Sequence, residues 1–590
     1  MWPDLDGNRL SGSRRAACGT CSLSHVAPMT RTSTKKHAMI SRLLLCGIVV
    51  AVATAVMMPR LASPRFGLLD DGVVILGSES LLRELRAGNY ASLFSLEAER
   101  GRFTPLISLY YAIQYAIWRQ TPAAFFAIQW LTLIATAITI SGIALVGTGD
   151  RLAAILSGVA YTVSGPAVES YYTLSKSEPP MVLWLALSLL CLLAAISARD
   201  AARTRGRMLF AASVALLLAA YFTKETALAM VLVSGMWACS ALWRERRCSS
   251  HSASRVMIAY FLASLAIALT FLVARTASGT AAVEVGGDSR GYLFAAEAMS
   301  ASLTRYVAWY VRDFPYLLPI LACMALILVR SREVRFRALG LMTHCALWVV
   351  GWTVIMLPWH SALEYYLLPA SVGTAVMTGL GSSVVAGYVR NGARPMKLFA
   401  LIACVATLCL ALLVLVNGCT NGRVQIAVDS SNAELVDYLA LNVPAGGTVL
   451  VNLPWFNEYV VELGLHLSLL KQRGDMQVGY AEGVDMSSQS DVFVVTPIMR
   501  NQPFPLVRIP LWDGGARALK TELQRNLGEQ ATPVWHTVHE VRLLTVWVER
   551  PVCLALLRLG ADGTDGTWCG VARPLIDRRL FEYGWEVYVI

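Results

Sequence analysis

Residues 104–118 read TPLISLYYAIQYAIW, and the course of this stretch decides the topology of the chain. It is apolar, but it has only 15 residues and includes Gln114, whereas a helix needs roughly 17 to 25 residues to span a bilayer. If it does not cross, the basic segments share one side: the N-terminus, Arg199–Arg207, Arg244–Arg255, Arg330–Arg337 and Arg390–Lys397. Cationic loops favour the cytoplasmic side. The stretch is therefore predicted to be a helix on the outer face that does not span.

The composition indicates a membrane protein. The chain has 590 residues, of which 56% are hydrophobic and 15% charged, and its mean hydropathy is +0.54. A soluble domain carries about 25% charged residues. The formal net charge of +11 is uneven: Lys and Arg outnumber Asp and Glu by 36 to 20 up to Val416, but are outnumbered 14 to 19 after it. This pattern favours cationic cytoplasmic loops over a nucleic-acid-binding surface, so no nucleic-acid partner is expected.

The predicted fold is a mainly α, polytopic helical membrane protein with about eleven transmembrane helices. Its N-terminus is placed in the cytoplasm and its C-terminus outside, which fits a multi-pass protein of the cytoplasmic (inner) membrane. The apolar runs lie near 40–59, 122–146, 152–172, 180–197, 208–222, 226–243, 256–274, 307–329, 338–358, 365–388 and 398–416. The predicted domains are a disordered cytoplasmic tail (1–38), a membrane domain (39–416) whose first outside loop (60–121) carries juxtamembrane helices, and an extracytoplasmic or periplasmic α/β domain (417–590).

The α/β prediction depends on a change of pattern after Val416. Helical spacing at Ala433–Leu441 and Asn457–Leu470 alternates with short apolar strands at Thr448–Leu453 and Asp491–Ile498. No glycine-rich phosphate loop is present, so a binding or lid role is the default.

Charged side chains at the outer membrane boundary are the candidate functional residues, because charges there are costly. They are Asp70, Asp71, Arg102, Lys176, Glu178, Lys224, Glu225, His360 and Glu364. Each has a structural alternative. Asp-Asp-Gly is a common turn, lysine and glutamate anchor helix ends at headgroups, and the tyrosines after Glu364 form an ordinary aromatic belt. The signal is their convergence on one face.

These motifs resemble the GT-C superfamily of membrane glycosyltransferases, which includes protein O-mannosyltransferases, aminoarabinose transferases and oligosaccharyltransferase catalytic subunits. The resemblance covers roughly residues 40–390 in organisation. It rests on the acidic motif Asp70-Asp71, on Gly101–Leu106 leading a non-spanning helix, on Glu178 in the second outside loop, and on Thr223–Thr226. Glu178 stands in Lys-Ser-Glu, whereas some relatives have an Asp-rich motif.

The resemblance implies a transferase that takes a sugar from a polyprenyl-phosphate donor, with inversion at the anomeric carbon. Asp70 or Asp71 is the expected base for the acceptor's proton. The other charged candidates would bind substrate; among them Arg102, Lys176 and Lys224 would stabilise the phosphate. A divalent cation, Mg²⁺ or Mn²⁺, is left open, with Asp70, Asp71 and Glu178 as its candidate ligands. The acceptor is left open between a glycan, a lipid and a protein.

Two alternatives remain at the level of sequence. A transporter or flippase for a lipid-linked or anionic substrate would use ionisable residues at broken helices, for which Glu169, Arg312 and Asp313 are the candidates. An inactive GT-C-like scaffold would keep donor binding without turnover.

Overall fold

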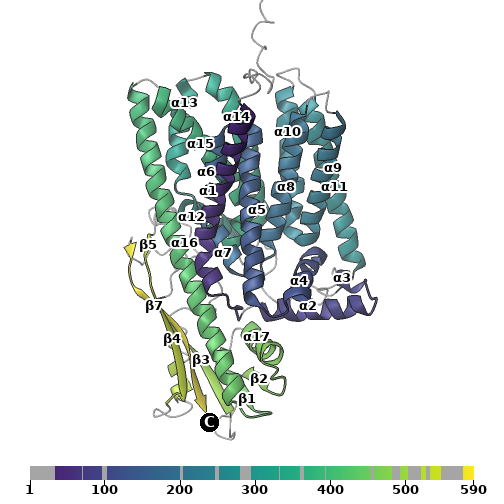
Figure 1. The fold of residues 1–590 in the computed structure, drawn as a ribbon, viewed down its shortest axis with the longest axis vertical. Helices are drawn as coiled ribbons and strands as arrows, with labels where there is room; N and C mark the ends of the chain where they lie inside the picture. The colour runs from purple at the N-terminus through teal and green to yellow at the C-terminus, as the bar shows by residue number, and fades with distance from the viewer. Residues whose placement is uncertain are drawn as a thin grey trace, which may run out of the picture.

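The structure is a computed structural model. It describes residues 34–68, 71–95, 103–198, 203–245, 252–278, 294–330, 332–358, 364–391, 394–453, 457–481, 492–501, 520–521, 523–525, 532–546 and 576–589. A helical bundle forms most of the molecule, and a small sheet lies beyond one end of it (Figure 1).

The helices within these ranges follow one another as expected for a polytopic chain. They are α1 (Thr34–Ala62), α2 (Asp71–Arg86), α3 (Ser92–Ser95), α4 (Pro105–Trp118), α5 (Pro122–Thr148), α6 (Arg151–Thr162), α7 (Gly165–Tyr172), α8 (Glu178–Ser197), α9 (Arg203–Thr223), η3 (Glu225–Leu228), α10 (Ala229–Glu245), α11 (Ser252–Ala277), α12 (Ala296–Asp313), α13 (Leu317–Arg330), α14 (Arg332–Met356), η5 (Glu364–Leu367), α15 (Leu368–Asn391), α16 (Arg394–Asn442), α17 (Asn457–Leu465) and η6 (His466–Leu470).

Within the described ranges, eight helices are long and apolar enough to cross a membrane, or ten if each of two bent pairs is one span. The protein is thus a multi-pass helical membrane protein. The bent pairs are the runs expected near 152–172, where α6 and α7 meet at 54°, and near 307–329, where α12 and α13 meet at 88°. The run near 338–358 lies within α14 (Arg332–Met356), of which Gly340–Met356 is an apolar part. The predicted count of about eleven spans is not confirmed, since the described residues give eight to ten.

Proline explains the position of both breaks. Pro166 is the second residue of α7 and Pro315 lies between α12 and α13. Proline donates no backbone hydrogen bond and its ring clashes with the preceding turn, so a helix ends before it and a new one begins at or after it. The length of an apolar run alone does not predict such a break.

The stretch that decides the topology is a short helix, α4, with 14 residues. At 1.5 Å per residue it is about 21 Å long, less than the roughly 30 Å of a bilayer's hydrocarbon core. Pro105 occupies its first turn, and its cap residue Arg119 has φ 52°, which turns the chain before Pro122 starts α5. Figure 1 shows α2 lying across the end of the bundle nearer the sheet, with α4 beside it.

The sheet has five strands in the order β2-β1-β3-β7-β4. They are β1 (Thr448–Val451), β2 (Gln477–Tyr480), β3 (Val492–Arg500), β4 (Trp535–Arg542) and β7 (Leu580–Val589); β5 (Thr545–Val546) pairs with β6 (Ile576–Asp577) separately. β1 is parallel to β2 and β3, and β7 is antiparallel to β3 and β4. With α17 between β1 and β2, this is the mixed α/β arrangement that the alternating pattern predicted.

One helix joins the bundle to the sheet. α16 is continuous over 49 residues, about 74 Å, so the domain boundary predicted at 416/417 falls inside a helix. Its first half exposes apolar side chains such as Leu401, Val405 and Leu408, as expected for a lipid-facing surface. Its second half packs on β4 and β7.

Hydrogen bonds fix the second half of α16 to β7. The Asn432 Oδ1 atom accepts from Trp585 Nε1 at 2.8 Å and from the Tyr583 hydroxyl at 3.2 Å. Each such bond contributes about 1 kcal/mol. The sheet is thereby tied to the helix that spans the membrane.

Candidate active site

Asp71 lies where α1, α2 and α16 meet. It is the first residue of α2, and its side chain is 2% exposed. Its Oδ2 atom accepts a hydrogen bond of 2.7 Å from the backbone N–H of Gly67, four residues earlier. The connection from α1 therefore folds back on the carboxylate. Asp70, its predicted companion, lies outside the described residues.

A buried ion pair stands beside Asp71. Arg60, at the end of α1, places Nη2 2.7 Å from Oδ2 of Asp429 on α16, with side chains 1% and 2% exposed. The same Nη2 donates to the Arg65 carbonyl at 3.0 Å, and the guanidinium carbon lies 3.9 Å from the centre of the Phe126 ring. Removing one member of so buried a pair leaves an uncompensated charge, which costs roughly 3 to 5 kcal/mol.

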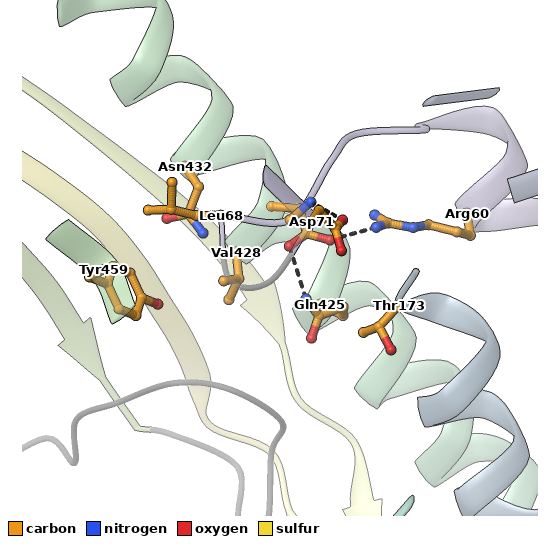
Figure 2. Close-up of a pocket in the computed structure, with 10 residues that line it drawn as sticks. Arg60, Leu68, Asp71, Thr173, Gln425, Val428, Asn432 and Tyr459 are labelled. Atoms are coloured by element: carbon orange, nitrogen blue, oxygen red, sulfur yellow. Dashed lines mark hydrogen bonds and ion pairs between the residues drawn. The ribbon is translucent and has the colours of Figure 1, made fainter. Parts of the chain in front are cut away.

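One face of α16 supplies the polar side chains opposite Asp71. Gln425 Nε2 donates to Asp429 Oδ1 at 2.9 Å. Gln425, Asp429 and Asn432 are spaced four and three residues apart, so they share one side of the helix. Figure 2 shows Gln425 and Asn432 around Asp71 and Arg60, with Thr173 nearby. The cavity that these side chains enclose is small, about 10 Å³, on the order of one water molecule.

Gly67 separates two carboxylates. A methyl group on Gly67 would lie 3.2 Å from Asp429 Oδ1 and 3.4 Å from Asp71 Oδ2. Both acidic groups therefore come within a few ångströms of one point, with Arg60 as the adjacent cation.

The C-terminal domain reaches the other side of Asp71 through α17. Glu462 Oε2 accepts from the Val73 backbone N–H at 3.3 Å, where a carboxylate complements the positive end of the α2 dipole. A methyl group on Gly72 would lie only 2.6 Å from that oxygen and 3.0 Å from the His466 ring. Glycine is thus required at residue 72, because α17 approaches the backbone so closely.

His466 is buried in this contact. Burial lowers the pKa of its imidazole from 6.5 to about 4; a hydrogen bond with the Gly67 backbone opposes this shift, and the nearby Lys471 ammonium adds to it. The ring is therefore neutral at pH 7. It also borders a second cavity of about 200 Å³, lined partly by Arg65, Phe66 and Lys471.

A second charged cluster contains four of the predicted residues. Lys224 Nζ lies 2.5 Å from Glu178 Oε1, and Glu178 is 1% exposed. Lys176 Nζ lies 3.1 Å above the Tyr365 ring. Burial lowers the pKa of the Lys224 ammonium, but Glu178 and the neighbouring Tyr366 and Glu225 outweigh it, and the net direction is upward. Lys224 accordingly stays charged.

The two clusters lie at either end of one short segment. Thr173 lines the cavity beside Asp71, and Lys176 follows three residues later. Three extended residues span at most about 11 Å. Lys176 therefore lies within one short segment of the cavity beside Asp71, while Asp71 and Lys224 have different partners. The convergence of Asp71, Lys176, Glu178 and Lys224 on one substrate site stays a prediction.

Other predicted residues contribute less to this geometry. Arg102 and His360 lie outside the described residues, as does the side chain of Glu364, whose backbone begins η5. The transporter candidates Arg312 and Asp313 pair with one another at the 88° bend, 2.8 Å apart.

A metal site finds no support among the described residues. They contain no group of three or more His, Cys, Asp or Glu side chains placed to hold an ion. Of the candidate ligands, Glu178 is paired with Lys224 and Asp71 is bound by Gly67. The described donors do not fit a divalent cation.

Arg60, Asp429, Glu462 and His466 were missed as functional candidates. Arg60 is one of six arginines between residues 60 and 103, in an outside loop that the positive-inside rule expects to be poor in cations. Its burial explains that anomaly, because Asp429 neutralises it. The polar spacing of Gln425, Asp429 and Asn432 could have indicated a helix face, had the helix been extended past residue 416.

Comparison with known proteins finds similarity only in structure. No protein-family model matches the chain, and no curated protein sequence matches it. The fold is similar to that of ArnT from Cupriavidus metallidurans bound to undecaprenyl phosphate, with 15% identity, coverage of 76% of this chain and 92% of ArnT, and a TM-score of 0.43. It is also similar to the archaeal oligosaccharyltransferase AglB from Archaeoglobus fulgidus in complex with an inhibitory peptide and a dolichol-phosphate, with 10% identity, coverage of 79% and 70%, and a TM-score of 0.47.

ArnT and AglB are GT-C superfamily membrane glycosyltransferases, the superfamily that the motifs of this chain resemble. At TM-scores below 0.5 and identities of 10% and 15%, these likenesses carry no information on catalytic residues or substrates. The fold class is a multi-pass helical bundle with one small mixed sheet.

Proposed function

We propose that this chain is an inverting glycosyltransferase that takes a sugar from a polyprenyl-phosphate donor on the outer face of the cytoplasmic membrane. The observation that carries the proposal is the buried Asp71 carboxylate at the end of the bundle, one short segment away from the Lys176–Lys224 cluster. A base and a set of cations on one membrane face are what transfer from a phosphate-linked sugar needs.

In the proposed reaction, the acceptor's nucleophilic group attacks the anomeric carbon from the side opposite the phosphate. Asp71 takes the proton of that group as its bond to the sugar forms. The bond between the anomeric carbon and the phosphate oxygen breaks, and the polyprenyl phosphate leaves with the electron pair. Lys176 and Lys224, with Arg102 from the adjoining loop, stabilise the phosphate charge. Attack opposite the leaving group inverts the anomeric centre.

The outer-face assignment rests on the positive-inside rule. The helix ends that flank the arginine-rich segments lie at the end of the bundle opposite α2 and the sheet (Figure 1). The sheet and both charged clusters then face the periplasm or its equivalent, and the N-terminus faces the cytoplasm.

The first prediction tests Asp71 as the base. Asp71→Asn keeps the shape and the Gly67 hydrogen bond but removes the proton acceptor, so we expect kcat for transfer to fall about 10²- to 10⁴-fold with little change in donor KM. The assay is sugar transfer from a polyprenyl-phosphate donor by the purified protein.

Glu84→Gln is the matched control, because Glu84 lies on the same helix and its carboxylate accepts a hydrogen bond from the exposed Asn89. It should retain wild-type activity. Full activity in an Asp70→Asn/Asp71→Asn double variant would remove the catalytic claim.

A transporter remains the second candidate because of one observation. The two bent helix pairs touch: a methyl group on Gly165, at the α6–α7 break, would clash with Asp313 Oδ1 at the α12–α13 break. Broken helices that meet at an ionisable residue are typical of transporters. Substrate flux in proteoliposomes without glycosyl transfer would favour this function.

A further inference from the structure

Two routes, one through an ion pair and hydrogen bonds and one through a hydrogen bond, lead from the C-terminal part of the chain to Asp71 and its loop. The first runs from Asp429 to Arg60, from the same Arg60 nitrogen to the Arg65 carbonyl, and from Gly67 two residues later to the Asp71 carboxylate. A single nitrogen thus contacts both α16 and the loop that holds Asp71.

The second route runs through α17. Glu462 accepts from the backbone N–H of Val73, in the first turn of the helix that Asp71 begins. Glu462 is itself 2% exposed, and the close contact at Gly72 fixes its distance from the loop. Asp71 is therefore held before and after its own position by side chains from residues beyond 416.

We propose that the C-terminal part of the chain is a positioning element for Asp71, acting through Asp429 and Glu462. The inference rests on the proposed function and gives that domain a role in it. A displacement of about 1 Å at a reacting group can lower a rate 10²-fold. Asp429 and Glu462 are positioning residues in this proposal, because they act on the loop through Arg60 and the Val73 amide.

The test separates positioning from stability. Asp429→Asn leaves Arg60 buried and unpaired and should lower the melting temperature. Arg60→Gln/Asp429→Asn removes both charges, so the melting temperature should recover towards wild type. A glutamine at residue 60 is too short to contact residue 429 and the Arg65 carbonyl together. In the double variant the loop between α1 and Asp71 should therefore remain less constrained than in wild type.

Two measurements report on the loop. Hydrogen–deuterium exchange of the peptide containing the Gly67 and Val73 amides should be at least about tenfold faster in the double variant, because local opening governs exchange. The kcat for transfer should fall about tenfold or more while donor KM stays within about twofold. Asp437→Asn, also on α16 but paired with the partly exposed Lys471, is the matched control and should change neither.

Glu462 provides an independent variant. Glu462→Gln keeps an oxygen that can accept from the Val73 amide, so this amide should stay protected from hydrogen–deuterium exchange. Glu462→Leu removes the acceptor, and the amide should then exchange faster. Wild-type exchange in both the Arg60→Gln/Asp429→Asn and Glu462→Leu variants would overturn the inference. If no variant or wild-type protein transfers sugar, the proposed function fails, and the exchange data alone still decide whether these residues hold the loop.

Discussion

Burial decides which individual residues matter at this site. The Asp71 motif stands out in the sequence because two adjacent acids follow the first membrane span, and the structure buries Asp71 beside a small pocket. Arg60 and Asp429 gave no such signal, because 369 positions separate them and each alone is an ordinary surface residue type. Pairing across that distance is a property of the fold, not of a local pattern.

His466 supports a prediction about pH and stability. Its pKa is about 4 in the folded protein and 6.5 when unfolded, so between these values the unfolded chain binds a proton that the folded chain does not. Stability should therefore be complete above about pH 6.5 and fall as pH drops towards 4, by up to about 3 kcal/mol.

His466→Gln should flatten this dependence when melting temperature is measured from pH 4.5 to 7.5. His539→Gln is the control, since His539 is partly exposed on β4 beside Glu434. If the melting temperature depends on pH equally in wild type and in His466→Gln, the lowered pKa of His466 is contradicted.

At the scale of elements, the contact between α2 and α17 depends on a glycine. Gly72→Ala would place a methyl group against Glu462, His466 and Leu465, and overpacking of this kind costs about 1 to 3 kcal/mol. We expect a lower melting temperature and faster proteolysis near α17.

Gly77→Ala is the matched control on the same helix. A methyl group there meets nothing within 4 Å, and alanine favours a helix over glycine by roughly 0.5 to 1 kcal/mol. This variant should be as stable as wild type or more so. If Gly72→Ala behaves like Gly77→Ala, the contact between α2 and α17 is not as described.

Elements with a strong local sequence pattern could be predicted from the sequence. Elements whose ends or bends depend on contacts with distant parts of the chain could not. Apolar runs predicted the spans, and the strands at β1 and β3 were expected within a few residues. The bends at Pro166 and Pro315 entered only through the transporter alternative and not through the list of spans, because both prolines lie inside runs of sufficient apolar length. α16 was divided at residue 416, where its apolar run ends, although polar residues on one face continue the helix to Asn442.

At the scale of the whole molecule, the orientation is open to a direct test. Leu441, at the end of α16, is 84% exposed, and Arg151, which begins α6, is also exposed, at the opposite end of the bundle (Figure 1). A membrane-impermeant thiol reagent should label Leu441→Cys in intact spheroplasts, and Arg151→Cys only after permeabilisation. Wild-type protein provides the background from native cysteines. The reverse pattern would place both charged clusters in the cytoplasm and remove the proposed donor site.

The continuity of α16 has a mechanical consequence. Roughly 40 Å of this helix extends past residue 416, and it carries the sheet with it. A helix adapts to a thinner or thicker bilayer by tilting, and a stiff rod transmits any such tilt to its far end. Asp429 lies on the projecting part of α16, so a tilt of this helix would move Asp429 relative to Arg60. We therefore expect the geometry of the pocket around Asp71 to change with the thickness of the bilayer.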